Sequence, residues 1–481
     1  MRHKHPRTLP LLLSAPLLAS ASFLSSLQPR SLLSSTLSLA SNSSSSTNGV
    51  TTVSTTGTYS GRFGHSSVYL SPPVNKLLII GGQLDSSTNS SESGSIEVTN
   101  EVLEFNVAGS YLWGEEREGS AIPDNPWAPS SLSLGEGEGS AFMGSGMDGD
   151  DELVWLIGGI KSGDCDGDVA IRSFNFSSLS SPSSSSSDSN GSSAWTTNST
   201  FLPRLPPRRR QASMVPIKNL TTLSTDLWVF GGIADEYSCS TSSQGTVGYE
   251  GIDRYSPKLG TVESFAWEKP INLNESEEWK GNPISDYSVE VLGDGTSVVI
   301  LGGQTSEGEF VGLENVLVFN VELREWYTKI TAGPAPSPRM GHISLSLSSS
   351  NSSSILLHGG LSPNHTLLSD LWLLTPPSLT VLSSFSDAED PKEDWEWKEL
   401  KISNESMSPP GLAYHAASEI VGGTIVVSFG LTDADEQGGE VSNKFWFLTI
   451  NEEEGTFTWK DTFNGNEQQV EQTLAEKTIG G

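Results

Sequence analysis

The chain has 481 residues and a formal net charge of −31, with 35% hydrophobic and 18% charged residues. This acidic balance excludes a protein that neutralises nucleic-acid phosphates with clustered Lys and Arg, and it argues against docking on anionic lipid. The 48 glycines and 26 prolines favour many short strands joined by turns over long helices.

The N-terminus has the layout of a targeting segment. Basic residues precede an apolar stretch over 9–18, and the small-x-small sequence Ala19-Ser20-Ala21 follows. This order predicts a secretory signal peptide over 1–21, cleaved after Ala21. A mitochondrial transit peptide is the alternative, because the segment is rich in Ser and the first acidic residue is Asp85. Residues 22–59 are a Ser/Thr-rich lead-in that we expect to be disordered.

Two further features agree with the secretory route. Asn-x-Ser/Thr sequons recur along the chain and are predicted N-glycosylation sites. They lie at Asn42, Asn89, Asn175, Asn190, Asn198, Asn219, Asn274, Asn351, Asn364 and Asn404. The only two cysteines, Cys165 and Cys239, permit one disulfide. No later stretch reaches the roughly 18 to 20 apolar residues of a membrane span.

Short apolar runs that end in Gly-Gly recur through the rest of the chain. They are Leu77–Gly82, Val154–Gly159, Leu227–Gly232, Val298–Gly303 and Ile355–Gly360, with a worn copy at Ile425–Gly430. Each run is too short for a helix and rich in strand-forming residues, so it predicts a strand buried on both faces. The paired glycines end the strand where a side chain would meet neighbouring backbone.

Other features repeat in register with these runs. An Arg/His segment lies upstream of several runs, at Arg62–His65, Arg210–Ser213, Arg339–His342 and Tyr414–Ala416. A strand with apolar residues follows, as at Val102–Asn106, Val316–Asn320, Leu371–Leu374 and Phe445–Leu448. A tryptophan closes each unit: Trp113, Trp195, Trp267, Trp326, Trp397 and Trp459. Each repeat unit therefore predicts four strands.

This order of features resembles the Kelch repeat, in the superfamily of propellers that includes galactose oxidase. The resemblance covers most of the chain after the lead-in. The chain looks like the variant found in fungal extracellular Kelch-domain proteins. It implies an all-β fold: a six-bladed propeller over 60–463 with four antiparallel strands per blade, followed by a polar tail over 464–481. The ring closes either with residues 51–59 as an outer strand of the last blade or without them. The second unit departs from the pattern, with Gly139–Phe142 in place of Arg/His.

The propeller also implies where the irregular segments lie. Residues 177–193 and 378–394 are too polar to pack and should be solvated loops between third and fourth strands. Cys165 and Cys239 follow the Gly-Gly pairs of two neighbouring units at matching places, so a disulfide between them is geometrically reasonable. Two free thiols are the alternative.

Several residues have both a candidate functional role and a competing structural one. Asp164–Asp168 resembles the start of a calcium loop, but Val169 and Asn175 stand where Gly and an acidic ligand are needed, so a solvated turn is favoured. Five histidines follow the signal: His65, His342, His358, His365 and His415. Three of them, His65, His342 and His415, lie at the first-strand position of their units, where a structural role is expected. The basic run Arg208-Arg209-Arg210 is expected to start a blade rather than to bind a ligand.

The sequence thus predicts neither catalytic nor cofactor-binding nor metal-binding residues. A copper oxidase would need two His, two Tyr and a Cys bonded to one Tyr, and that set cannot be placed here. We expect a monomeric secreted or cell-surface module whose loops bind a protein or a glycan, with no nucleic-acid or membrane partner. The alternatives are an enzyme with a site at the channel mouth, built from several blades, and an intracellular Kelch adaptor.

Overall fold

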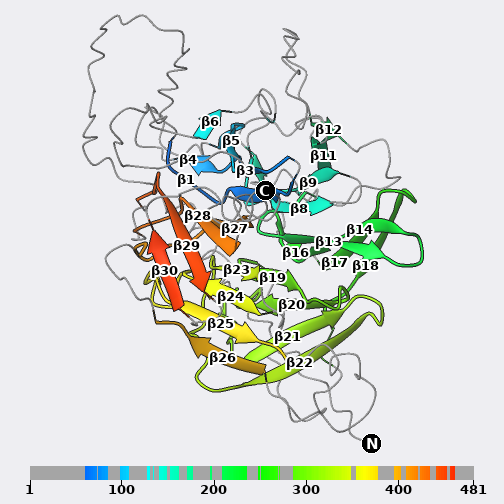
Figure 1. The fold of residues 1–481 in the computed structure, drawn as a ribbon. Helices are drawn as coiled ribbons and strands as arrows, with labels where there is room; N and C mark the ends of the chain where they lie inside the picture. Colours follow the sequence, from blue (N-terminus) through cyan, green and yellow to red (C-terminus); the bar gives the residue numbers. More distant parts are fainter. Residues whose placement is uncertain are drawn as a thin grey trace, which may run out of the picture.

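The strands form a ring of sheets in the computed structural model, which describes residues 60–460 apart from gaps (Figure 1). The longest gaps cover 85–97, 108–126, 162–170, 177–194, 198–207, 236–247, 271–284 and 378–394. The predicted signal, lead-in and tail lie outside the described residues, as do Cys165, Cys239 and both Ser-rich loops. Within the described residues, no helix is long and apolar enough to cross a bilayer.

Each repeat unit of the sequence folds as four consecutive antiparallel strands. Unit 1 comprises β2 (Ser66–Leu70), β3 (Lys76–Ile80), β5 (Val102–Asn106) and β6 (Trp127–Pro129). Unit 2 comprises β8 (Gly144–Asp148), β9 (Leu153–Ile157), β11 (Ile171–Asn175) and β12 (Thr196–Thr197). Unit 3 comprises β13 (Ser213–Asn219), β14 (Ser224–Phe230), β17 (Ile252–Ser256) and β18 (Thr261–Phe265). Units 4 to 6 comprise β19 (Ser288–Val291), β20 (Ser297–Leu301), β21 (Asn315–Asn320) and β22 (Glu325–Ala332); β23 (Ile343–Ser346), β24 (Ile355–His358), β25 (Leu371–Thr375) and β26 (Trp395–Glu399); and β27 (Ala416–Ile420), β28 (Thr424–Ser428), β29 (Phe445–Asn451) and β30 (Thr456–Lys460).

Two short two-stranded sheets join the chain just before a unit's first strand to the chain just after its second. They pair β1 (Arg62–Phe63) with β4 (Gln83–Leu84) and β7 (Ser140–Ala141) with β10 (Ile160–Lys161). A third sheet pairs β15 (Ile233–Ala234) with β16 (Gly248–Tyr249), both between the second and third strands of unit 3. The predicted Arg/His segments lie before the innermost strand, and only their last residues in units 3 and 6, Ser213 and Ala416, enter it. This corrects the expected strand assignment.

The apolar Gly-Gly runs form the second strand of every unit, as predicted. In β20 every residue is buried, because the neighbouring units cover both faces of the strand. The glycines are required by their surroundings: Gly81 has φ +63°, and a Cβ there would lie 2.3 Å from the Ser140 carbonyl oxygen.

The closing tryptophans agree only in part with the prediction. Trp326, Trp397 and Trp459 lie in fourth strands and are buried. In unit 1 the fourth strand contains Trp127 instead, and Trp113 lies outside the described residues. Trp267 follows β18 rather than lying within it, and its ring stacks on Trp326 at 4.7 Å. The sequence pattern places a tryptophan near the end of each unit, but it does not show which of two nearby tryptophans lies in the fourth strand.

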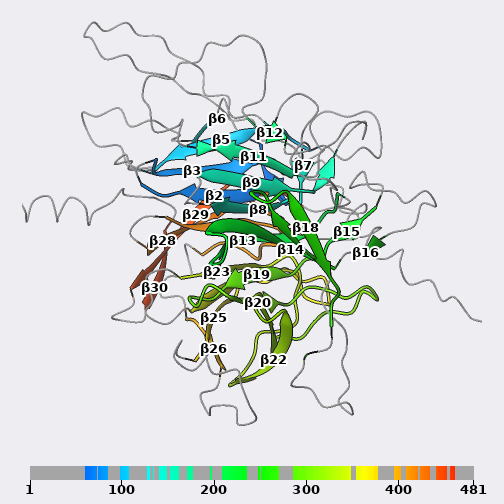
Figure 2. The same cartoon turned by 90° about the vertical axis from the view of Figure 1, so that its right-hand side faces the viewer.

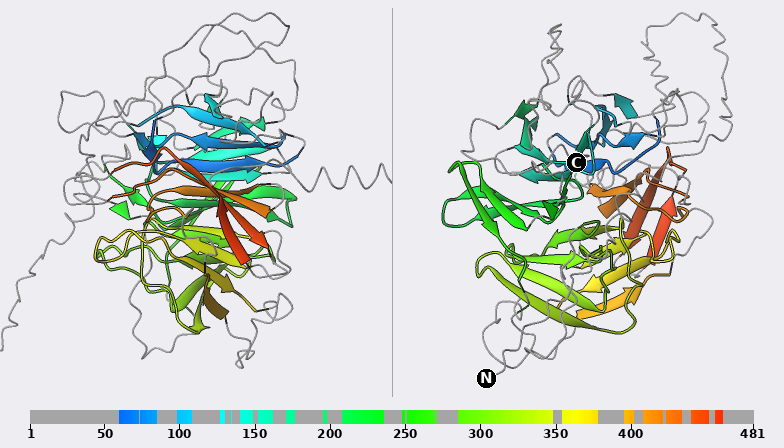
Figure 3. Two further views of the ribbon diagram at one scale, coloured as in Figure 1. Left: turned by 60° about the vertical axis from the view of Figure 1, so that its left-hand side comes forward. Right: turned by 180° about the vertical axis from the view of Figure 1, so that it is seen from behind.

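Apolar clusters between successive units hold the ring together, and one of them joins unit 6 to unit 1. This cluster combines Leu77 and Leu103 with Val426 and Phe447, and Figures 1 and 3 show β27–β30 beside β1–β6. The last sheet has the order β27-β28-β29-β30, so its outer strand comes from the C-terminal side of the described chain.

The all-β Kelch-type propeller is therefore confirmed, and in side view the sheets lie one above another (Figure 2). Units 4 and 5 form one continuous eight-stranded sheet, because β22 pairs in parallel with β26 through Thr331 and Trp395. The expected number of six separate blades stays a prediction.

Candidate functional site

Three fully buried arginines recur at one place, two residues before a left-handed backbone position. Each guanidinium donates to the carbonyl of the first glycine of the Gly-Gly pair and forms an ion pair with a carboxylate at the start of the third strand. The sets are Arg62 with Gly81 and Glu101, Arg209 with Gly231 and Asp253, and Arg339 with Gly359 and Asp370. These arginines therefore fasten the second strand to the third within a unit, which is a structural role.

The repeat register at the basic run differs by one residue from the prediction. Arg209, not Arg210, is the equivalent of Arg62 and Arg339, because the left-handed residue of this unit is Gln211. The repeat pattern in the sequence points to Arg210 as the equivalent residue, because this unit has no glycine to mark the turn. The expected role of the run in starting a blade is confirmed.

Arg208 compensates for a missing arginine in the preceding unit. Ser140 stands at the arginine position of unit 2, and Arg208 donates to its Oγ at 2.9 Å and to the Gly159 carbonyl at 2.9 Å. Ser140 Oγ in turn donates to the Ile160 carbonyl at 2.9 Å. The anomaly of unit 2 is thus repaired by the neighbouring unit, which a linear reading of the repeat could not reveal.

Six residues with left-handed backbone circle the axis, one from each unit. They are Gly64 (φ +62°), Phe142 (+57°), Gln211 (+57°), Asp286 (+58°), Gly341 (+61°) and Tyr414 (+53°). Backbone N–H groups of this set donate to carbonyls of the preceding member: Phe142 to Gly64, Gln211 to Phe142, Gly341 to Asp286, Tyr414 to Gly341 and Gly64 to Tyr414. We call this set the axial ring. Because Gly64 bonds to Tyr414, the ring closes between the first and last units.

Four members of the axial ring are not glycine, although left-handed φ is strained for most side chains. The other two positions need glycine. A Cβ on Gly64 would lie 2.9 Å from the Phe142 ring, and a Cβ on Gly341 would lie 2.8 Å from the Tyr414 ring. Each of the two glycines is therefore covered by the aromatic ring of the next unit.

A cavity of about 180 Å³ lies at the axial ring. Its lining consists of the six ring residues, the residue that follows each of them, and Ser213. Apart from Ser213, the lining thus consists of the same two consecutive positions from each unit. Sequence reasoning did not single out Phe142, Gln211, Asp286 or Tyr414 as a set. The available signal was their shared place immediately before the position that His occupies in units 1, 5 and 6.

The three histidines that immediately precede first strands, His65, His342 and His415, line this cavity and also link units. The Nε2 atom of each ring lies at hydrogen-bonding distance from a group of the preceding unit in the ring. The pairs are His65 with Ser428 Oγ (2.8 Å), His342 with Ser288 Oγ (2.9 Å), and His415 with His358 Nδ1 (3.0 Å). Burial lowers the pKa of His65 and of His342 to about 3, so both rings are neutral near pH 7. The expected structural role is confirmed, and the histidines converge on one cavity despite coming from different units.

Two further polar side chains of the lining, Asp286 and Gln211, come from units 4 and 3. Asp286 Oδ2 accepts from Gln304 Nε2 and from Ser285 Oγ, both at 3.0 Å. Its Oδ1 has no hydrogen-bond partner. Burial raises the pKa of this carboxyl, against the opposing effects of its hydrogen bonds and of the Arg210 charge.

Gln211 is held in the same way on the neighbouring unit. Its Oε1 accepts from Arg210 Nη1 at 2.6 Å, and Arg210 is itself fixed by two bonds to Asp235 Oδ2, at 2.8 and 3.0 Å. The Gln211 Nε2 has no hydrogen-bond partner, and the residue is 8% exposed.

Aromatic rings also line the cavity. The Phe142 and Tyr414 rings meet edge to face at 5.4 Å, and Phe63 packs against both, at 5.8 and 6.5 Å. These rings belong to an apolar cluster of loop residues that also includes Met340 and Leu361. The Tyr414 side chain also forms a hydrogen bond with Asp286. The cavity is therefore amphipathic, with aromatic rings beside an acceptor and a donor.

The other predicted site residues are placed only in part. Asn175 and Asn364 are exposed. Asn219 is half-buried, and its amide is engaged: Nδ2 donates to Asp226 Oδ2 at 2.8 Å, and Oδ1 accepts from the Thr221 and Thr222 N–H groups. The remaining sequons, the two cysteines and the acidic turn at 164–168 lie outside the described residues. His365 is exposed at a turn.

No group of three or more His, Cys, Asp or Glu among the described residues could hold a metal ion. In particular, the Nε2 atoms of the cavity histidines lie against Ser or His groups of the preceding unit. The described donor set therefore does not fit the ligands that a copper centre needs.

Comparison with known proteins agrees with the fold. Residues 288–472 match the family model of the KLHDC2/KLHL20/DRC7 Kelch-repeats domain. The chain contains Kelch repeats and forms a Kelch-type propeller, a class of domain that generally mediates protein interactions.

Two solved structures are similar in overall shape. One is described as the structure of YjhT, with 12% identity, a TM-score of 0.47 and coverage of 83% of this chain and 97% of that one. The other is a novel fungal alcohol oxidase of the AA5 family in complex with copper, with 13% identity, a TM-score of 0.44 and coverage of 84% and 66%. Neither likeness carries an inference about what this chain binds.

Proposed function

We propose that this protein is a secreted or cell-surface Kelch propeller that binds a protein or glycan partner through the loops at one end of the ring. The observation that carries the proposal is the Kelch-repeat match over 288–472, on a ring whose repeated arginines are used inside the units. A rigid ring of this kind presents variable loops at fixed positions. The secretory part rests on the N-terminal segment over 1–21 and on the sequons.

The protein collected from the medium of a eukaryotic host tests the binding. It would be labelled and applied to arrays of extracellular proteins and of glycans. We expect saturable binding to one member or a related group. Absence of binding on both arrays, with an intact fold, would contradict the proposal.

Two loop variants of unit 1 then assign the binding end. The connection 85–97 joins the second to the third strand, and 108–126 joins the third to the fourth. Because consecutive strands are antiparallel, these connections leave the sheet at opposite ends. Each would be replaced by a Gly-Ser linker in an otherwise unchanged protein, so that each variant is the control for the other. Loss of binding in one variant only is the expected result, and equal retention in both moves the site away from unit 1.

A further inference from the structure

The axial cavity has the construction of a binding site rather than of a packing fault. Asp286 and Gln211 are 7% and 8% exposed, yet each presents one polar atom without a partner. Buried polar groups are normally hydrogen-bonded, and an orphan atom beside a cavity indicates a missing partner. The other polar atom of each side chain is fixed, by Gln304 and Ser285 in one case and by Arg210 in the other.

The backbone gives a second, independent indication. Phe142, Gln211, Asp286 and Tyr414 hold left-handed φ values between 53° and 58°. Glycine serves at the same position in two other units, so the backbone conformation alone does not select these side chains. Strain of this kind clusters at functional sites, where surrounding structure maintains it.

The chemistry of the lining narrows the class of ligand. The cavity offers an acceptor at Asp286 Oδ1 and a donor at Gln211 Nε2, which an ammonium ion with donors only would not satisfy together. An anion would meet the Asp286 carboxyl, while Arg210 is already paired with Asp235. A hydroxyl group both donates and accepts, so neighbouring hydroxyls satisfy both atoms. The carbon side of such a molecule would lie against the Phe142 and Tyr414 rings.

Size and access agree with this class. A cavity of about 180 Å³ has room for several water molecules, which is the space of a small polyol. The innermost strands β19 and β23 are half-exposed throughout, although they lie on the inner side of their units. The central channel is therefore open to solvent along these strands.

We propose that the axial cavity binds a small uncharged polyol, up to the size of a monosaccharide, with Asp286 and Gln211 as the hydrogen-bonding residues and Phe142 and Tyr414 as the apolar wall. This site is separate from the loop surface proposed above. Its success or failure does not depend on a macromolecular partner.

The test is ligand-observed NMR on the full secreted chain with four probes: erythritol, glucose, choline and acetate. We expect saturable binding of erythritol or glucose with a Kd in the millimolar range, given the few atoms of the ligand. Asp286→Asn and Gln211→Asn should each weaken this binding about tenfold, since each loses one hydrogen bond in a buried site. Asn suits left-handed backbone, so neither change adds strain.

Leu223→Asn is the matched control. Leu223 also has left-handed backbone, with φ +52°, but it is 72% exposed on the β13–β14 turn. It should bind polyol like the unchanged protein. Binding of choline or acetate alone, no binding of any probe to the folded protein, or equal polyol binding in all three variants would overturn the proposal.

Discussion

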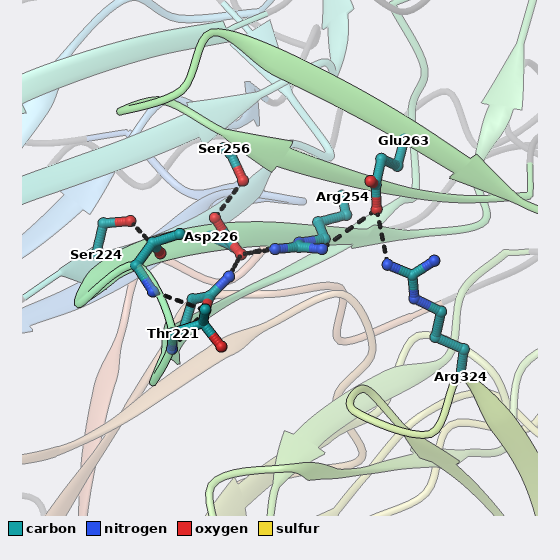
Figure 4. A network of polar contacts seen from close by, with 9 residues as sticks. Thr221, Ser224, Asp226, Arg254, Ser256, Glu263 and Arg324 are labelled. Atoms are coloured by element: carbon teal, nitrogen blue, oxygen red, sulfur yellow. Dashed lines mark hydrogen bonds and ion pairs between the residues drawn. The ribbon is translucent and has the colours of Figure 1, made fainter.

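The molecule contains two arginine–carboxylate systems that look alike in sequence and differ in surroundings. Near the axis, Arg339 is fully buried and pairs with Asp370. At the outer edge, Arg254 links Asp226 to Glu263, and Arg324 of the next unit reaches the same Glu263 at 3.1 Å (Figure 4). Glu263 and Arg324 are 47% and 48% exposed. Burial, not the chemical type of the pair, therefore decides which contacts the ring depends on.

The largest effect is expected at the buried pair. Arg339→Ala should lower the free energy of unfolding by about 3 kcal/mol, because it removes the cation paired with Asp370 and the donor to the Gly359 carbonyl. Denaturant unfolding measures this. The double variant Arg339→Met with Asp370→Asn should be more stable than Arg339→Ala, since it removes the unpaired charge and keeps an acceptor for Trp372 Nε1. If the double variant is no better, the unpaired charge is not the cause.

Gly341→Ala tests the axial ring. Left-handed φ costs an alanine about 1 kcal/mol, and displacing the Tyr414 ring should add about 1 to 2 kcal/mol. Gly295→Ala is the matched control, because Gly295 has φ +70° and open space around it. Thermal unfolding of both variants isolates the contact, and equal losses would show that Tyr414 does not rest on Gly341.

Acid should weaken the ring through its histidines. His65 and His342 have pKa values of about 3 in the folded chain and His358 of about 4, against 6.5 when exposed. Between pH 6.5 and 4 the unfolded chain therefore binds more protons, so stability is full above pH 6.5 and falls with pH below it. Each such histidine contributes up to about 1.4 kcal/mol per pH unit.

Buried carboxyls act in the opposite direction. Burial raises the pKa of Asp286 and of Glu290, so their protonation in the folded chain adds stability as the pH falls and partly offsets the histidines.

His342→Asn should flatten the loss of stability with falling pH, measured by denaturant unfolding from pH 7 to 4.5. An unchanged slope in this variant would show that His342 does not titrate on unfolding.

The smallest effect is expected at the outer edge. Arg324→Asn should change the free energy of unfolding by less than about 1 kcal/mol, because the ion pair is exposed and Asn accepts the left-handed backbone of this position. The difference from the unchanged protein should shrink as salt is added. A loss as large as that of Arg339→Ala would refute the distinction between the two regions.

The sequence predicted the parts of the fold that rest on local pattern. The second strands coincide with the Gly-Gly runs, and β5 and β24 begin and end at predicted residues. It failed where one unit supports another. Nothing in the linear repeat shows that Arg208 serves unit 2, or that Gln211 takes the place of a glycine. The cavity was missed for the same reason, because its lining gathers one dipeptide from every unit.

The most direct measurement of the central claim, an extracellular binding module, is the intact mass of the protein secreted by a eukaryotic host, taken without reductant after enzymatic release of N-glycans. The account predicts a chain that begins at Ser22, Asn-to-Asp mass shifts at sequons and the loss of two hydrogens for a Cys165–Cys239 bridge. A protein retained inside the cell, unglycosylated and with free thiols, would contradict the account and favour an intracellular Kelch adaptor.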